Sequence, residues 1–343
     1  MKFAESLKTI PEFYFFADKY LSLGKEPAVI AFPVFLHAAP EELPRIASGR
    51  DISANISIIS PDIFKLKIGL RKRAAEGYLL NHQSYWITII QSEKKDSSVA
   101  EVALRWVQDM FPIVTPAYIT SRQLIDLVES LNIVEGARIT VLDYVTRSIS
   151  EEETTKRWPK NLVFSKQAIL AKVRRDNALV DAIRIRFSSP NIEFRAKLSR
   201  KGQIIFYDGA FSEFQRLVIS RLVKLAKSNL DAMGKRERLI TDGEVKLEPL
   251  SIRPERELDK ADMVRLRVSL ERKYMTAVLY GGNPWLLLSL IDKSDGSTFD
   301  LQAYHDEIII TPVIRVSAAS LARLYSTLEE VLPTNLLKLP VRG

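Results

Sequence analysis

The sequence contains no cysteine among its 343 residues and only three histidines, His37, His82 and His305. The absence of cysteine excludes a disulfide scaffold, a thiolate zinc site, an iron–sulfur centre and a cysteine nucleophile. None of the histidines has a partner in the sequence that would position it as a general base. We therefore assign no catalytic residue and no metal ligand from these residue types.

The glycine motifs that bind phosphate are absent as well. The sequence has no phosphate loop, no dinucleotide-binding pattern and no nucleophile elbow. Its pair Gly281-Gly282 precedes Asn283-Pro284, which predicts a turn between strands rather than a phosphate cradle. We expect no cofactor and favour a non-enzymatic function.

Long apolar runs are also missing. The most apolar stretch, 28–39, contains Pro33 and is shorter than the roughly 20 residues that a membrane-spanning helix needs. Glu5 and Lys8 stand where a signal peptide would need an apolar core. These features predict a cytoplasmic protein without a membrane partner.

The composition is that of a globular protein, with 46% hydrophobic and 27% charged residues. Its periodicity predicts an α+β fold, in which antiparallel β-sheets are each backed by amphipathic helices and a strand–strand–helix unit occurs about three times. We expect an N-terminal α+β domain at 1–150, a linker with a short basic helix at 151–180, and a C-terminal α+β domain at 181–343. The last domain divides further into units at 181–234 and 263–333.

The clearest helix prediction begins at Ser98-Val-Ala-Glu101, which has the form of a capping box. Apolar residues then recur at helical spacing, with Trp106 in the middle of the stripe, so we expect this tryptophan in the core. Pro33 interrupts a predicted strand over 29–36 and favours a sheet edge or a bulge there. Further helices are predicted over 12–23, 121–131, 166–175 and 317–331, with another ending near Gly234.

Each predicted unit opens with an alternation of apolar and basic residues, which we call a basic pentad. The three pentads are Phe64–Ile68, Ile183–Phe187 and Val264–Val268. Alternation with period two predicts strands whose basic side chains share the face opposite the apolar ones. The segments 63–73, 184–201 and 265–273 together hold fifteen basic and two acidic residues, whereas the whole chain has a net charge of only +8. All of the positive excess therefore lies on or beside the pentads.

Like charges side by side on a sheet repel, so their clustering favours an anionic ligand. Phosphate is the usual one, and arginine matches its geometry. We predict a nucleic-acid-binding protein, for DNA or RNA, that contacts the phosphate backbone as part of a larger assembly. The candidate contact residues are Lys65, Lys67, Arg71, Arg73, Arg184, Arg186, Arg195, Lys197, Arg265 and Arg267. Aromatic residues near the basic strands are candidates for base stacking, although core packing is their commoner role: Tyr78, Tyr85, Trp86 and Tyr207.

Two alternatives remain open. An acidic protein surface would compensate the basic faces as well as phosphate does, which describes a scaffold or adaptor subunit. The third reading is a carboxylate-metal nuclease, because Pro61-Asp62 precedes the first basic strand and Glu93-Lys94-Lys95 follows a later one. Solvated loop charge explains both acidic positions equally well, so we rank the nuclease last.

Overall fold

The computed structural model describes residues 7–22, 27–48, 52–70, 73–93, 97–148, 155–158, 162–176, 178–234, 249–254, 256–282, 285–313 and 316–332. The chain forms two compact units. Unit 1 comprises Met1–Thr146, Arg157–Leu170 and Val180–Ala226, and unit 2 comprises Arg147–Lys156, Ala171–Leu179 and Lys227–Gly343. Both units draw on separate stretches of the chain, so they differ from the domains that composition suggested.

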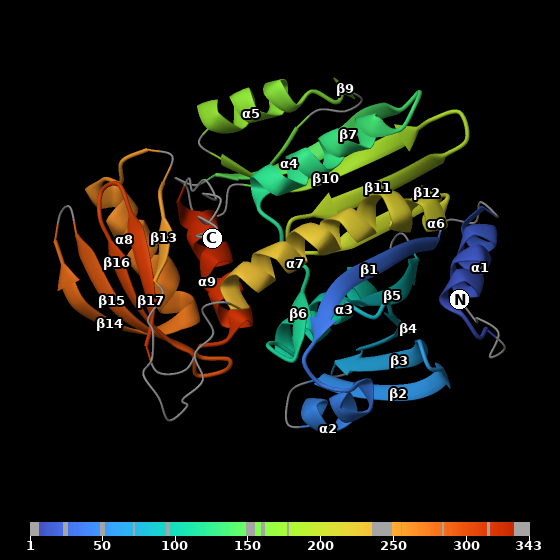
Figure 1. Ribbon diagram of the computed structural model, residues 1–343, viewed down its shortest axis with the longest axis horizontal. Coiled ribbons are helices and arrows are strands. Elements are labelled where there is room, and N and C mark those ends of the chain that lie inside the picture. Colours follow the sequence, from blue (N-terminus) through green and yellow to red (C-terminus); the bar gives the residue numbers. More distant parts are fainter. Residues whose placement is uncertain are drawn as a thin grey trace, which may run out of the picture. The chain divides into compact units, whose positions relative to one another are not determined.

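The larger sheet has the strand order β2-β3-β4-β5-β1-β12-β11-β10-β7-β8, with β6 paired to β1 and β9 to β7 (Figure 1). From β2 to β10 along this order, neighbouring strands are antiparallel. The α+β class is therefore confirmed. The strands are β1 (Pro27–Leu36), β2 (Ile52–Ser60), β3 (Ile63–Leu70), β4 (Arg73–Asn81), β5 (Trp86–Glu93), β6 (Val114–Pro116), β7 (Arg138–Ser148), β8 (Thr155–Arg157), β9 (Leu162–Val163), β10 (Ala178–Ser188), β11 (Glu193–Ser199) and β12 (Ile204–Gly209).

Helices follow the strand runs, as the periodicity predicts. The helix predicted over 166–175 has those bounds in the structure, and the one predicted from Ser98 begins one residue earlier. Thr120 caps its helix by accepting a hydrogen bond from the Gln123 backbone. The helices are α1 (Ile10–Ser22), η1 (Pro40–Glu42), α2 (Leu43–Ala47), α3 (Ser97–Asp109), α4 (Ser121–Glu129), η2 (Ser130–Ile133), α5 (Lys166–Arg175), α6 (Phe211–Phe214), the π-helical η3 (Gln215–Ile219) and α7 (Ser220–Gly234).

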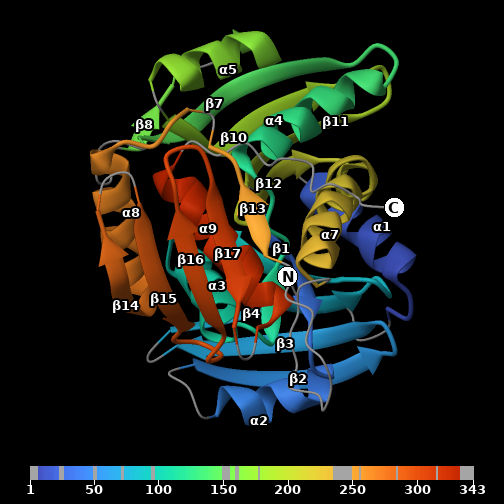
Figure 2. The same ribbon diagram turned by 60° about the vertical axis from the view of Figure 1, so that its left-hand side comes forward.

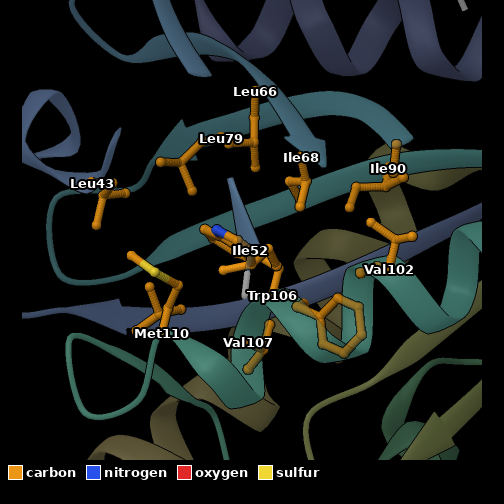
Figure 3. Close-up of a cluster of buried hydrophobic side chains, with 14 of the residues drawn as sticks. Leu43, Ile52, Leu66, Ile68, Leu79, Ile90, Val102, Trp106, Val107 and Met110 are labelled. Carbon is orange, nitrogen blue, oxygen red and sulfur yellow. The ribbon is translucent and has the colours of Figure 1, made fainter. Parts of the chain in front are cut away.

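Trp106 lies fully buried in the core beneath β3, β4 and β5, as predicted (Figure 3). It shares this cluster with Phe64, Leu66 and Ile68, the apolar members of the first basic pentad. Val102 of α3 and Met110, which directly follows that helix, belong to the same cluster. The first pentad therefore buries its apolar side against an amphipathic helix.

The two halves of the large sheet bury opposite faces. Paired residues across adjacent strands point to the same side, and one such row runs through Leu66, Gly77, Ile90, Ile30 and Ile205. The helix α3 covers the start of this row. In the second half the buried side chains belong to the other face, where Phe206 contacts Phe211 of α6 at a ring distance of 5.0 Å. One continuous sheet therefore changes its covered face between β5 and β12.

Pro33 was expected at a sheet edge or a bulge, but β1 is a central strand between β5 and β12, and its register with β5 continues through Pro33. On one side of β1, residues 29–31 pair with β12, whereas residues 34–36 pair with β6. Pro33 falls between these two partners, where a backbone N–H would have no ladder carbonyl to reach. The change of neighbouring strand accommodates the proline in the middle of the sheet.

Unit 2 contains the second sheet, with antiparallel order β13-β17-β16-β15-β14. The hairpin predicted at Gly281-Gly282 is confirmed, because β14 and β15 pair on either side of it. The elements are β13 (Leu250–Ile252), α8 (Lys260–Lys273), β14 (Tyr274–Gly281), β15 (Leu286–Asp292), β16 (Thr298–Ala303), β17 (Ile308–Pro312) and α9 (Ala318–Val331). None of the helices that the structure describes combines the length and the hydropathy needed to span a lipid bilayer.

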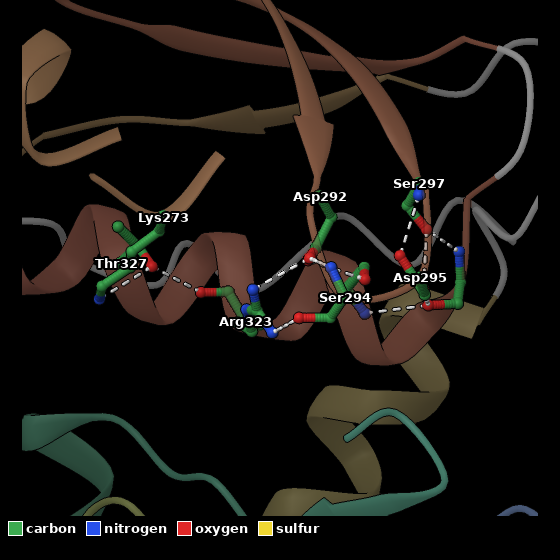
Figure 4. Close-up of polar contacts among 9 residues, drawn as sticks. Lys273, Asp292, Ser294, Asp295, Ser297, Arg323 and Thr327 are labelled. Atoms are coloured by element: carbon green, nitrogen blue, oxygen red, sulfur yellow. Dashed lines mark hydrogen bonds and ion pairs between the residues drawn. The ribbon is translucent and has the colours of Figure 1, made fainter. Parts of the chain in front are cut away.

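A buried polar network fixes α9 to the sheet of unit 2 (Figure 4). Asp292 accepts hydrogen bonds from Arg323 at 2.9 Å and from Ser320 at 3.0 Å. Asp295 accepts one from Ser317, the N-cap of α9, at 2.6 Å. Burial raises the pKa of the Asp295 carboxyl, but hydrogen bonds led by that of Ser317 outweigh it and lower the pKa below its usual value. The network is a structural support for the helix terminus.

The third basic pentad is not a strand, contrary to the prediction. Val264–Val268 lies inside α8, whose N-cap Asp259 forms a capping box with Asp262. Met263, Leu266 and Leu270 are the buried stripe of this helix. Residues two apart on a helix point about 200° away from each other. Arg265 and Arg267 therefore do not share a face.

Candidate nucleic-acid interface

The first pentad forms β3 with the predicted alternation. Phe64, Leu66 and Ile68 are buried, and Lys65 and Lys67 are exposed. Strand pairing therefore places both lysines on the side of the sheet opposite α3.

The lysines belong to a wider surface that we call the open sheet face. It is formed by the exposed side chains of three neighbouring strands, β2, β3 and β4, which lie side by side at one margin of the sheet (Figure 2). In register, Ser57 lies opposite Lys65, and Asn55 lies opposite Lys67, which in turn lies opposite Glu76. The members of the open sheet face are Ser53, Asn55, Ser57, Lys65, Lys67, Ala74 and Glu76.

The charges on the open sheet face are exposed and only partly compensated. Lys67 Nζ lies 3.1 Å from Glu76 Oε1, and both side chains are about 60% exposed, so water screens the pair. Lys65 forms no ion pair within the described part of the chain. Arg73 pairs with Glu101 of α3, on the other face, and Arg71 lies outside the described residues.

The second pentad and its neighbour β11 bring four basic residues together. Arg184 lies opposite Lys197, and Arg186 lies opposite Arg195, all on one face of the sheet. Two like-charged pairs directly across a ladder destabilise it unless opposite charges lie close. The four basic side chains of β10 and β11 therefore need carboxylates close to them.

Carboxylates of the same unit provide that compensation. Arg184 pairs with the buried Asp143 of β7, and Arg186 Nε lies 3.8 Å from Glu193. Arg195 Nε donates to Asp208 of β12 at 2.7 Å. The arginines of this face are thus bound to acidic side chains contributed by neighbouring strands.

The basic faces of the first two pentads point to opposite sides of the sheet. The row of paired residues that contains Lys65 runs through Tyr78, Ile89, Ala31, Ile204, Leu198 and Ile183. Arg184, the next residue after Ile183, therefore lies on the other side. The candidates of β3 and of β10–β11 do not form one binding surface.

The third pentad lies in unit 2 and is neutralised locally. Arg265 pairs with the buried Asp262, which also accepts hydrogen bonds from Arg256 at 2.6 and 2.9 Å. Burial alone would raise the pKa of Asp262, but hydrogen bonding and the arginine charges lower it below its usual value. Arg267 lies 3.3 Å from Glu271 in the next turn. These residues stabilise a helix.

The four aromatic candidates pack within the protein. Tyr78 is buried against Phe13 of α1, with ring centroids 5.2 Å apart. Trp86 packs on Phe64, Tyr85 stacks on His82, and the guanidinium of Arg184 lies 6.0 Å from the ring of Tyr207. The aromatic residues near the basic strands therefore have core or intramolecular partners.

The two acidic positions of the nuclease reading lie at opposite ends of β5. Asp62 precedes Ile63, which aligns through Leu80 with Ile87 near the start of β5. Glu93 is six residues further along that strand, roughly 20 Å away at the usual rise per residue. Lys94 and Lys95 lie outside the described residues. Within those residues, no group of acidic or histidine side chains is arranged to hold a metal ion.

The acids that bind the arginines were not predicted from the sequence, and neither was a cluster around His82. His82 Nε2 lies 2.7 Å from the hydroxyl of Tyr14, and its ring stacks on Tyr85. Burial lowers the pKa of His82 to about 4, although nearby Asp62 acts in the opposite direction. No local signal in the sequence links these residues, because Tyr14 and His82 are 68 positions apart.

No protein-family model matches the sequence, and no curated protein matches it either. The functional assignment therefore depends on the geometry of the surfaces described above.

Proposed function

We propose that the protein binds nucleic acid through the open sheet face, where it holds the phosphate backbone without reading bases. The observation that carries this proposal is the register of Ser57 with Lys65 and of Asn55 with Lys67 on an uncovered three-stranded surface. Ammonium, hydroxyl and amide groups are the side chains that contact phosphate oxygens in sequence-independent binding.

The electrostatics of the open sheet face support the same proposal. The pair between Lys67 and Glu76 is exposed, so its contribution to folding is small and a phosphate can replace the carboxylate as partner. In contrast, Arg184 and Arg195 are already held by carboxylates on the opposite face.

Backbone contact is favoured over base recognition because the open sheet face carries no aromatic side chain. Proteins that hold single strands stack bases on exposed aromatic rings. Tyr78 is in the same row as Lys65 but is buried against α1. We therefore expect comparable binding to different base sequences.

Fluorescence anisotropy of labelled duplex and single-stranded probes, measured over a series of salt concentrations, tests the proposal. Its test variant is Lys65→Glu with Lys67→Glu, and the matched control is Lys224→Glu with Lys227→Glu on the exposed side of α7, which changes the net charge equally. If both lysines contact phosphates, the test variant should lower the slope of log K against log salt by about 1.8 for duplex DNA or 1.4 for single strands. The control should bind like the native protein.

Three results would refute the proposal. They are absence of binding by the native protein, equal weakening in both variants, and an unchanged salt slope in the test variant. If a protein partner is lost with Lys65 and Lys67 while nucleic-acid binding persists, the open sheet face is an adaptor surface instead.

A further inference from the structure

The hairpin of β14 and β15 is unusual in its composition. Residues 274–291 form eighteen consecutive positions without a charged side chain, in a chain of which 27% is charged. The apolar residues of this hairpin are not all buried. Six of them are between 40% and 59% exposed, and we call them the apolar edge patch: Met275, Val278, Leu279, Tyr280, Trp285 and Ile291.

The patch lies on a strand with an open edge. In Figure 1, β14 is the outermost strand of the orange sheet, and within the described residues it pairs only with β15. The strand at the other end of this sheet, β13, has three residues, whereas β14 has eight. A long edge strand presents unpaired backbone N–H and C=O groups, which proteins usually protect with charged side chains or proline. β14 has neither.

The edge strand β2 of the other sheet is protected by polar side chains. Its exposed side chains include Ser53, Asn55 and Ser57, which are polar, and Ile58 is an exposed apolar one. β14 instead exposes Met275, Val278 and Leu279. β14 therefore differs from β2 in exposing several apolar side chains along an edge of eight residues, and the two-residue strand β9 also exposes Leu162 and Val163.

The open backbone edge identifies the kind of partner. A lipid surface would cover the apolar side chains but would leave the backbone groups without hydrogen bonds, at a cost of several kcal/mol per group. Another strand satisfies both requirements. The partner is therefore a β-strand with few charges.

We propose that this strand is β14 of a second copy of the chain, paired antiparallel about a twofold axis. In such a pairing each residue faces a residue of the same strand in the second copy, and a residue on the axis faces itself, so charges of one sign on β14 would repel each other. β14 avoids this repulsion completely. The net charge of +8 disfavours association through most other surfaces, and the uncharged hairpin is where two copies meet at the lowest electrostatic cost.

The register of the pairing follows from an irregularity in β14. The regular pairing with β15 shifts between Val278 and Tyr280, which bends the end of the strand. The straight part, 274–278, has Thr276 at its centre. A twofold axis there places Thr276 opposite Thr276 of the second copy and Met275 opposite Ala277, and each such pair lies on one face of the joined sheet.

The first experiment measures the molar mass of the full chain by light scattering during gel filtration at micromolar concentrations. We expect the native protein to elute as a dimer. The variant Met275→Lys with Leu279→Lys adds two charges to β14, one of them next to the axis, and should elute as a folded monomer. The matched control, Phe15→Lys with Ile58→Lys, adds the same charges at two other exposed apolar positions and should remain a dimer.

The second experiment uses the absence of native cysteine. Residues directly opposite in an antiparallel pair have Cα atoms about 4.5–5.5 Å apart, which is within the range of a disulfide. In this register Thr276→Cys faces its own copy and should therefore form a covalent dimer on mild oxidation, faster than single cysteines at 275, 277 and 278, whose copies lie further apart. Cysteine in place of Ile58 is the control and should crosslink only at the slow rate of random collision.

Several outcomes would overturn the proposal. They are a monomeric native protein, a dimer that survives the Met275→Lys and Leu279→Lys changes, and crosslinking at β14 no faster than at position 58. Native protein that is monomeric but floats with neutral phosphatidylcholine vesicles would assign the patch to a membrane instead. None of these results depends on nucleic-acid binding, so the experiments test this proposal independently of that function.

Discussion

The second and third basic pentads share one pattern and differ in structure. Ile183–Phe187 lies in the second half of β10, and Val264–Val268 lies in the middle of α8. In β10 the apolar members are all buried on one side of a paired strand. In α8 only Leu266 of the pentad is buried, and the other members lie around the helix.

The residues outside the pentads decide between the two structures. Asp259 and Asp262 supply a helix start, and Met263, Leu266 and Leu270 follow at helical spacing. Asp262 with Arg265, and Arg267 with Glu271, are also pairs that meet only on a helix. β10 instead continues over eleven residues with β-branched side chains and no cap. Five alternating residues are too few to distinguish strand from helix.

The largest expected effect concerns the apolar side of a strand pentad. Trp106→Ala removes the ring that packs with Leu66 and Ile68 in a fully buried cluster. Truncating a buried aromatic residue costs about 3–5 kcal/mol of unfolding free energy. Chemical denaturation measures this loss, and a change below about 1 kcal/mol would show that α3 does not anchor the pentad.

The two pentads should differ in how much stability is lost when one of their arginines is replaced. Arg184→Gln leaves the carboxylate of Asp143 buried without its arginine, and we expect a loss of about 2–4 kcal/mol. Arg267→Gln removes one exposed pair on α8 and should cost less than about 0.5 kcal/mol. Equal losses, measured by urea denaturation, would contradict our distinction between the two environments.

Much of the fold was predictable because it depends on local patterns. The helices α3, α5 and α9 have capping signals or apolar stripes that lie within one segment, and the β14–β15 turn has its own Gly-Gly sequence. Pro33 was misplaced because its surroundings depend on β6 and β12, which lie far along the chain. The change of covered face in the large sheet depends on strand order in the same way.

The candidate site was less predictable for the same physical reason. Counting charges within continuous segments made the pentads look uncompensated, since Asp143, Asp208 and Glu76 come from other strands. The alternation with period two correctly predicted that Lys65 and Lys67 share one face, because that prediction requires only that the segment is a strand. It could not show that the basic residues of β10 point to the other side, which requires the full pairing register.

A smaller effect is expected at the helix pentad. Asp262→Ala removes the carboxylate that accepts a hydrogen bond from the backbone of the N-cap Asp259 and that pairs with Arg256 and Arg265. Both arginines reach solvent, so we expect the loss to be about 2 kcal/mol, near the upper end for a helix cap. Circular dichroism and denaturation measure it. Asp262→Asn keeps part of the capping and should lose less, whereas identical losses would assign the effect to the charge alone.

The smallest expected effect is a difference between the two units on acidification. In unit 1 the folded protein disfavours protonation of His82, whose pKa is lowered from 6.5 to about 4. The unfolded chain binds this proton below about pH 6.5, so the stability that the neutral ring contributes is complete above that pH and declines towards pH 4. We expect a loss of about 1 kcal/mol between pH 7 and pH 5.5 that is absent in His82→Phe.

In unit 2 the carboxyls of Asp262 and Asp295 also have lowered pKa values, so the sign is the same, but the stability is lost over a lower pH range. The pKa values of Asp262 and Asp295 are lowered on folding, so their contribution is complete above the usual carboxyl range near 3.8 and is lost as the pH falls through the folded values. Hydrogen exchange followed by mass spectrometry should therefore detect weaker protection in β4 and β5 at pH 5.5, while α8 and α9 keep theirs until the pH falls below about 4. The difference arises because a neutral imidazole is retained in one unit and charged carboxylates in the other. Weakening of α8 before β4 on lowering the pH would contradict this assignment.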